Sequence, residues 1–218
     1  AAVVDEAGRL VGVITVDDIV EVISEEAAED IRLLAGVGEE AISDSVFQTT
    51  RSRFPWLFVN LFTAVIAASV IALFDAAIEQ MVALAVLMPI VASMGGNAGT
   101  QTMTVTVRAL ATRDLVNFNA RRTILREFLV GIVNGALFAV LLGCLVFLVF
   151  GNLSLGGVIA AAVLINFIAA CLAGILIPLG LDKIGVDPAV SSAVFVTTTT
   201  DVIGFFSFLG LAALVLFY

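Results

Sequence analysis

Long apolar stretches separated by short polar segments occupy the chain from residue 54 to its C-terminus. A helix needs about 20 apolar residues to cross the hydrocarbon core of a bilayer. Five stretches reach that length, and we place them at 54–74, 81–107, 128–150, 158–181 and 189–218. The pattern therefore predicts five transmembrane helices.

The first 50 residues follow a different pattern. A run rich in β-branched residues at 10–15 follows the turn-forming segment 5–8, which predicts a β-hairpin within the first 15 residues. From Val16 apolar residues recur every four positions, as on one face of a helix that we expect to end at Gly36 and Gly38. A polar connector is expected at 39–50. The predicted fold class is an all-α integral membrane protein, with five transmembrane helices preceded by a short cytoplasmic β-hairpin and an acidic amphipathic helix.

Composition supports this division. Hydrophobic residues make up 61% of the chain, above the share in soluble domains. Residues 1–50 hold 12 acids and 2 bases, whereas the remainder holds 7 acids and 8 bases. An acidic segment thus precedes a nearly neutral membrane domain, and nucleic acid is not an expected partner. The chain has no histidine, and Cys144 and Cys171 lie in apolar spans, where we interpret them as packing residues.

The distribution of arginine and lysine predicts the orientation in the membrane. These residues precede the first span and follow the second and fourth, whereas the loops after the first and third spans carry none. By the positive-inside rule, the N-terminus is expected to be cytoplasmic and the C-terminus extracytoplasmic. The expected location is the cell (inner) membrane.

Asp201 is the strongest candidate for a functional residue. It is the one ionisable side chain between Ala189 and the C-terminal residue, and four threonines precede it. A carboxylate at that depth is costly unless it faces water, a cation or a partner. One interpretation is a buried Asp hydrogen-bonded to a neighbouring helix. We favour a cation site in a membrane pathway, with Gly204 leaving a gap on nearly the same face.

A glycine-rich segment in the second span is the other unusual membrane sequence. We expect it to interrupt the helix, and the amides of Asn97 and Gln101 lie four residues apart on one face. Open backbone or exposed amides are tolerated in a membrane only inside the protein or beside water. A close helix contact through small residues is the alternative. We favour a pore lining, and we interpret Asn166 in the fourth span as an interhelical hydrogen-bonding residue.

The amphipathic helix carries acids on one face, at positions 18, 21, 25 and 29. Like charges at this spacing repel weakly. The face is either simply solvated or holds divalent cations that offset the repulsion.

Several motifs resemble the MgtE family of magnesium channels. Pro89, together with the sequence Gly-Gly-Asn-Ala-Gly-Thr-Gln at 95–101, is similar to a signature of that family. Residues 108–115 and the segment from Gly185 to Gly204 also resemble motifs of the family. Residues 8–19 resemble the end of a CBS domain. The resemblance implies a truncated CBS domain at 1–18, an acidic connecting (plug) helix and connector at 19–50, and a five-helix pore domain at 51–218.

The resemblance also implies a function and its residues. It implies a homodimeric, Mg²⁺-selective channel that passes the hydrated ion, gated by cytosolic Mg²⁺. Asp201 would bind the ion with the carbonyls of Thr197 and Ala193. The implied pore-lining residues are Pro89, Gly95, Gly96, Asn97, Gly99, Gln101 and Gly204. The implied regulatory metal ligands are Asp18, Glu21, Glu26, Glu29 and Asp30.

Three other functions are alternatives to this one. A proton- or Na⁺-coupled divalent cation carrier would need a relay of ionisable groups, and the spans supply one acid at depth. An intramembrane aspartyl protease would need two carboxylates that share a proton. A purely regulatory module would have little use for paired amides in a span. The sequence does not distinguish Mg²⁺ from Mn²⁺, Co²⁺ or Ni²⁺ as the transported ion.

Overall fold

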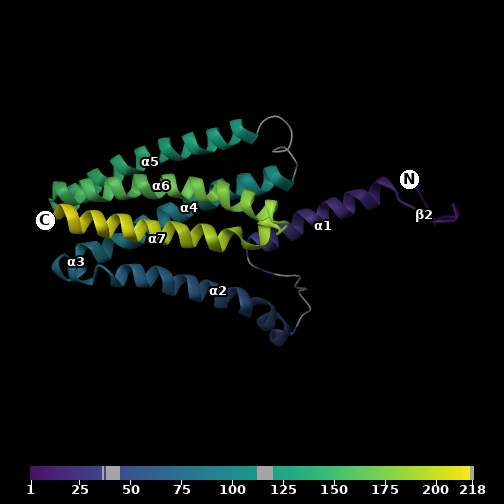
Figure 1. Cartoon of the computed structure of the whole chain (residues 1–218), viewed down its shortest axis with the longest axis horizontal. Coiled ribbons are helices and arrows are strands. Elements are labelled where there is room, and N and C mark those ends of the chain that lie inside the picture. The colour runs from purple at the N-terminus through teal and green to yellow at the C-terminus, as the bar shows by residue number, and fades with distance from the viewer. Residues whose placement is uncertain (36, 38–44, 112–119, 217–218) are drawn as a thin grey trace. The chain divides into compact units, whose positions relative to one another are not determined.

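The computed structural model describes residues 1–35, 37, 45–111 and 120–216, and it divides into two compact units (Figure 1). The units are Ala1–Arg53 and Phe54–Tyr218. The expected helix end at Gly36 and Gly38 lies outside the described residues.

The N-terminal unit begins with the predicted β-hairpin. Strands β1 (Ala2–Val4) and β2 (Leu10–Val13) pair antiparallel. The turn between them includes Gly8 at φ 77°, a left-handed conformation that glycine adopts without steric cost.

Helix α1 (Val16–Leu34) follows the hairpin and begins where the apolar period predicted it. Its first turn is held by a capping box, in which the backbone N–H of Thr15 donates to Asp18 Oδ2 at 2.7 Å. The Thr15 hydroxyl donates to the same oxygen at 2.8 Å. These hydrogen bonds from Thr15, the backbone one first, lower the pKa of the exposed Asp18 carboxyl.

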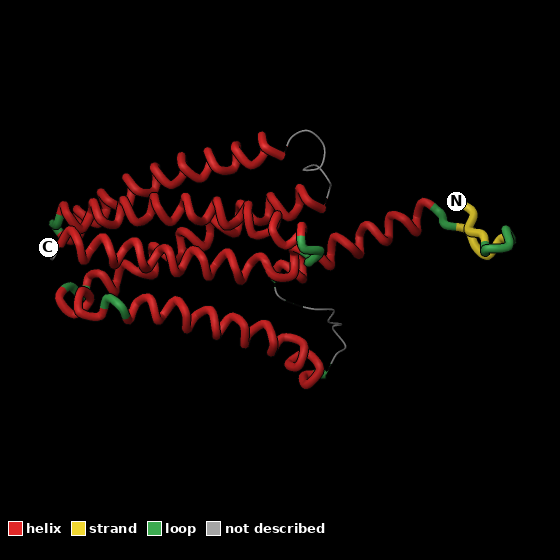
Figure 2. The backbone as a smooth tube through the Cα atoms, viewed as in Figure 1, coloured by secondary structure: helices red, strands yellow, loops and turns green. Residues whose placement is uncertain are grey.

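The remaining helices are α2 (Val46–Ala72), α3 (Asp75–Gln80), α4 (Ala83–Ala111), α5 (Ala120–Phe150), α6 (Leu153–Lys183) and α7 (Pro188–Leu216). Within the described residues, α2, α4, α5, α6 and α7 are long and apolar enough to cross a membrane. The prediction of five transmembrane helices is confirmed. The tube in Figure 2 shows the short turns that join α5 to α6 and α6 to α7.

Four local predictions were wrong. The glycine-rich segment 95–101 does not interrupt the second span, since α4 is helical from Ala83 to Ala111. A continuous helix pairs most of its backbone groups within the segment, as a bilayer requires, and close neighbouring helices fill the gaps at Gly95 and Gly99. Residues 75–80, between the first two predicted spans, form the helix α3 and not a loop. The turn between the third and fourth predicted spans, expected at 151–156, is shorter because α6 begins at Leu153, capped by Asn152. The connector also ends early, because α2 begins at Val46.

Helix α6 is the centre of the membrane unit. It packs against α4, α5 and α7, which lie alongside it in Figure 1. Glycines allow the contact between α6 and α5, because a Cβ on Gly156 would lie 2.7 Å from the Gly143 carbonyl oxygen. A Cβ on Gly135 would lie 2.8 Å from the Cβ of Phe167. The core includes Leu84, Val91, Ile159, Val163 and Phe208, all fully buried.

Candidate functional site

Asp201 lies in the middle of α7, and its side chain is half-buried. Among the described residues, none forms a hydrogen bond or an ion pair with its carboxylate. The interpretation of Asp201 as a structural residue hydrogen-bonded to a neighbouring helix therefore finds no partner within the described part of the chain. A cation or a water molecule on the exposed side of Asp201 would supply the partner that its carboxylate lacks among the described residues.

The threonines before Asp201 satisfy their hydroxyls within α7. Thr197 donates to the Ala193 carbonyl oxygen at 2.9 Å, and Thr200 donates to the Thr197 carbonyl oxygen at 2.9 Å. These two carbonyls are the ones expected to assist Asp201. Each accepts a threonine hydroxyl in addition to its helical N–H, so a water molecule around a cation would compete with that hydroxyl.

Helix α4 carries a stripe of exposed positions along one face, four of them polar and one a proline. Pro89, Ser93, Asn97, Gln101 and Thr104 recur every three or four residues, and all are exposed. We call these five residues the α4 stripe. The two amides cannot face lipid without cost, so the stripe needs water or a protein surface beside it.

The other predicted pore-lining residues are glycines at helix contacts. Gly95, Gly99 and Gly204 are buried, and Gly96 is partly buried. A Cβ on Gly99 would lie 2.6 Å from Val196 Cγ1 of α7, and one on Gly96 would lie 3.9 Å from the Thr200 hydroxyl oxygen. These glycines set how closely α4 approaches its neighbours. Their place at the wall of a pore stays a prediction.

Part of the α4 stripe lines a groove of about 860 Å³ between α4, α5 and α6. Asn97, Gln101 and Thr104 lie on one side of it, and α5 contributes three polar residues, Arg126, Glu127 and Asn134. These three residues are not among the functional residues predicted from the sequence. The available signal for Asn134 was an amide inside an apolar span, whereas Glu127 lies just before the predicted span 128–150. Asp201 does not line this groove.

Comparison with known proteins assigns the family. A family model described as the divalent cation transporter MgtE matches residues 88–211, which include the α4 stripe and Asp201. The chain belongs to the MgtE family. The family consists of transporters and not of enzymes.

Three curated relatives have the name "Magnesium transporter MgtE". The protein of Enterococcus faecalis is 39% identical over 216 residues, covering 99% of this chain and 48% of the relative. The Bacillus subtilis protein is 37% identical, covering 96% and 47%, and the Thermus thermophilus protein is 39% identical, covering 98% and 48%. The chain thus spans about half the length of the curated relatives it matches.

The predicted regulatory acids of this MgtE-family chain lie on α1. Asp18 and Glu21 are exposed and Glu29 is partly buried, whereas the side chains of Glu26 and Asp30 lie outside what the structure describes. One oxygen of Asp18 serves the capping box, which leaves the other available. Within the described ranges, no three acidic or cysteine side chains form a group that could hold a metal.

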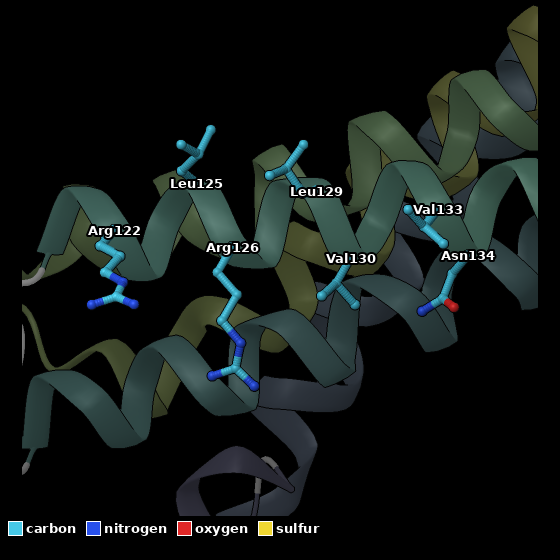
Figure 3. Close-up of a pocket in the computed structure, with 7 residues that line it drawn as sticks. All are labelled: Arg122, Leu125, Arg126, Leu129, Val130, Val133 and Asn134. Atoms are coloured by element: carbon cyan, nitrogen blue, oxygen red, sulfur yellow. The ribbon is translucent and has the colours of Figure 1, made fainter.

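A second groove of the membrane unit follows the surface of α5 (Figure 3). Its volume is about 550 Å³, and its walls are mostly aliphatic, with Arg122 and Arg126 toward one end and Asn134 toward the other. Both guanidinium groups extend to the same side of α5 (Figure 3). Neither Asp201 nor the glycine contacts belong to this groove.

Proposed function

We propose that the full-length protein is a Mg²⁺-selective channel whose ion passes beside Asp201. The observation that carries the proposal is the half-buried Asp201 carboxylate inside a membrane span, without a partner among the described residues. Mg²⁺ gives up its water reluctantly and is held through one or two carboxylates while it keeps several waters. The names of the curated relatives, magnesium transporters, support this choice of ion.

The pore is formed by two copies of the chain. One copy contributes a single carboxylate at membrane depth and one polar α4 stripe, and a two-fold axis would double both. Helix α2 supports the pairing, since only 6% of the residues along its most apolar stretch are buried within the chain. A second copy would cover part of this surface and close the pathway between the two α4 stripes.

The orientation follows from charge. The bases Arg121, Arg122 and Arg126 begin α5, and Lys183 ends α6. With these helix ends in the cytoplasm, the N-terminal unit is cytoplasmic and the end of α7 is extracytoplasmic. The membrane that the helices span is the cell (inner) membrane.

Cytosolic Mg²⁺ closes the channel by bridging the acids of α1. Asp18, Glu21, Glu26, Glu29 and Asp30 are the bridging residues we propose. Bridging removes their mutual repulsion, so the ion stabilises whichever state brings carboxylates together. Neutralising Glu26, Glu29 and Asp30 together should leave channels open at millimolar Mg²⁺, and patch recordings with unchanged inhibition would contradict the regulatory role.

The decisive experiment is Mg²⁺ flux into proteoliposomes that hold the full-length protein. Asp201→Asn removes the charge but little volume, so flux should fall by at least about tenfold, while insertion and dimerisation stay normal. Glu79→Gln in α3, outside the five spans, is the matched control and should keep wild-type flux. Wild-type flux in a correctly assembled Asn variant would overturn the proposal.

Channel and carrier are separated by the driving force. A channel passes Mg²⁺ down its own gradient with single-channel currents, and a proton or Na⁺ gradient leaves the rate unchanged. Flux that requires either gradient would instead identify a coupled carrier.

A further inference from the structure

Asn166 is a polar residue in the most buried part of the molecule. It lies in the middle of α6, its exposed fraction is 0%, and its Nδ2 donates to the Val91 carbonyl oxygen of α4 at 2.9 Å. The interhelical hydrogen bond expected from the sequence is therefore confirmed. The Asn166 side chain also lies close to glycines of two neighbouring helices, α4 and α7.

The Asn166 amide occupies a gap that two glycines leave, one on each neighbouring helix. A Cβ on Gly204 of α7 would lie 2.7 Å from Asn166 Nδ2, and a Cβ on Gly95 of α4 would overlap the amide group. Gly204 is three residues from Asp201, and Gly95 is two residues from Asn97 of the α4 stripe. The amide thus touches both helices to which we assign the pathway.

Packing alone does not account for an amide here. Asn166 Oδ1 is buried and has no hydrogen-bond partner among the described residues. An unsatisfied buried acceptor costs stability, and an apolar side chain that filled the gap would avoid that cost. Asn166 is therefore a position where stability is sacrificed, which is typical of functional regions.

We infer that Asn166 is a positioning residue that sets the distance between α4 and α7 and thereby places Asp201 relative to the α4 stripe. The inference rests on the proposed function, because the placement matters only if the ion passes between these helices. The Nδ2 bond holds the amide to α4, while the contact with Gly204 limits how closely α7 approaches. Asn166 does not itself bind the ion.

The contact between Asn166 and Gly204 can be tested by suppression in the full-length protein. Gly204→Ala should lower Mg²⁺ flux by at least about tenfold, because the new methyl group overlaps the amide. Asn166→Ala combined with Gly204→Ala should recover flux to within about threefold of Asn166→Ala alone, because the methyl group fills the space left by the amide. Gly210→Ala, on the same helix with only ordinary contacts to Phe74, is the control and should behave as wild type.

Positioning also predicts a change in affinity that a merely structural residue would not cause. In Asn166→Ala the half-saturating Mg²⁺ concentration should rise at least about threefold, in protein whose dimer content and thermal stability are normal. A double variant no better than Gly204→Ala alone, or an unchanged half-saturating concentration in Asn166→Ala, would overturn the inference. Where Gly204→Ala does not fold, recovery of folded protein by the double variant, measured by size exclusion, tests the same contact.

Failure of the proposed channel function can be distinguished from failure of the inference about Asn166. A wild-type protein without Mg²⁺ flux would overturn the channel but not the helix spacing. The spacing has its own measurement, the rate of disulfide formation in Gly96→Cys combined with Thr200→Cys, in a background in which Cys144 and Cys171 are replaced. That rate should fall in Gly204→Ala and recover in the double variant, and an equal rate in all three proteins would show that Asn166 does not set the distance.

Discussion

Helices α2 and α6 are both apolar enough to span a membrane, yet they relate to the rest of the chain in opposite ways. Along their most apolar stretches the mean hydropathy is 2.0 for α2 and 2.6 for α6, but 6% of the residues are buried in α2 and 61% in α6. Lipid tails are as apolar as leucine side chains, so hydrophobicity does not decide which helix is central. Close approach of backbones does.

The difference in burial follows from side-chain size. Helix α6 presents small residues at its contacts, such as Gly156 toward α5 and Gly174 toward α4. Helix α2 instead carries large exposed side chains on several sides, including Leu57, Val59 and Phe62. Dispersion contacts favour the helices whose backbones come closest. The comparison teaches that small residues mark the centre of this membrane unit, whereas hydropathy marks only its spans.

The largest effect is expected where a glycine lies directly against the backbone of a neighbouring helix. A Cβ on Gly174 would lie 2.8 Å from the Gly99 carbonyl oxygen, which is backbone and cannot turn aside. Gly174→Leu should therefore lower the free energy of unfolding in detergent by about 3 kcal/mol. Gly157→Leu on the same helix, with nothing within 4 Å of its added Cβ, should cost much less. Equal losses would show that glycine itself, and not the contact, is needed in α6.

A smaller effect is expected from cavities. Ile159 of α6 is fully buried, and Ile159→Ala should cost about 2 kcal/mol, because packing is lost even where the transfer from water contributes little. Leu61 of α2 is 61% exposed, and Leu61→Ala should leave unfolding of the single chain nearly unchanged. A comparable loss for Leu61→Ala, accompanied by dissociation of the dimer, would sharpen the comparison by showing that a second copy buries α2.

The smallest effect is expected at the start of α1, a helix outside the spans that is held by hydrogen bonds. The pKa of Asp18 is lowered in the folded helix. The ionised carboxylate therefore stabilises the first turn above its unfolded pKa of about 3.9, and this stabilisation is lost as the pH falls through the lower pKa of the folded state. Amide hydrogen exchange in the first turn, corrected for intrinsic rates, should therefore accelerate on acidification. Thr15→Ala should give the fast exchange already at neutral pH. A first turn that is equally protected at neutral and at acidic pH would show that the capping box does not stabilise the helix.

The sequence by itself determined the membrane class, the five spans, the hairpin and the start of α1. Each of these depends on local pattern, because the length of an apolar run and the period of apolar residues act on the chain segment that carries them. Asp201 could be selected for the same reason, since an acid inside an apolar run is costly whatever surrounds it. The amide of Asn166 was recognised as an interhelical hydrogen bond, but its acceptor, Val91, could not be named.

Only the tertiary structure decided which face of each helix is covered. It showed that Gly95 and Gly204, separated along the chain, both accommodate the Asn166 side chain, and that α4 stays helical through its glycines. It also brought Glu127 and Asn134 of α5 to the groove beside the α4 stripe. These outcomes depend on which backbones approach closely, which is a property of several helices at once. A periodicity within one helix carries no information about its neighbours.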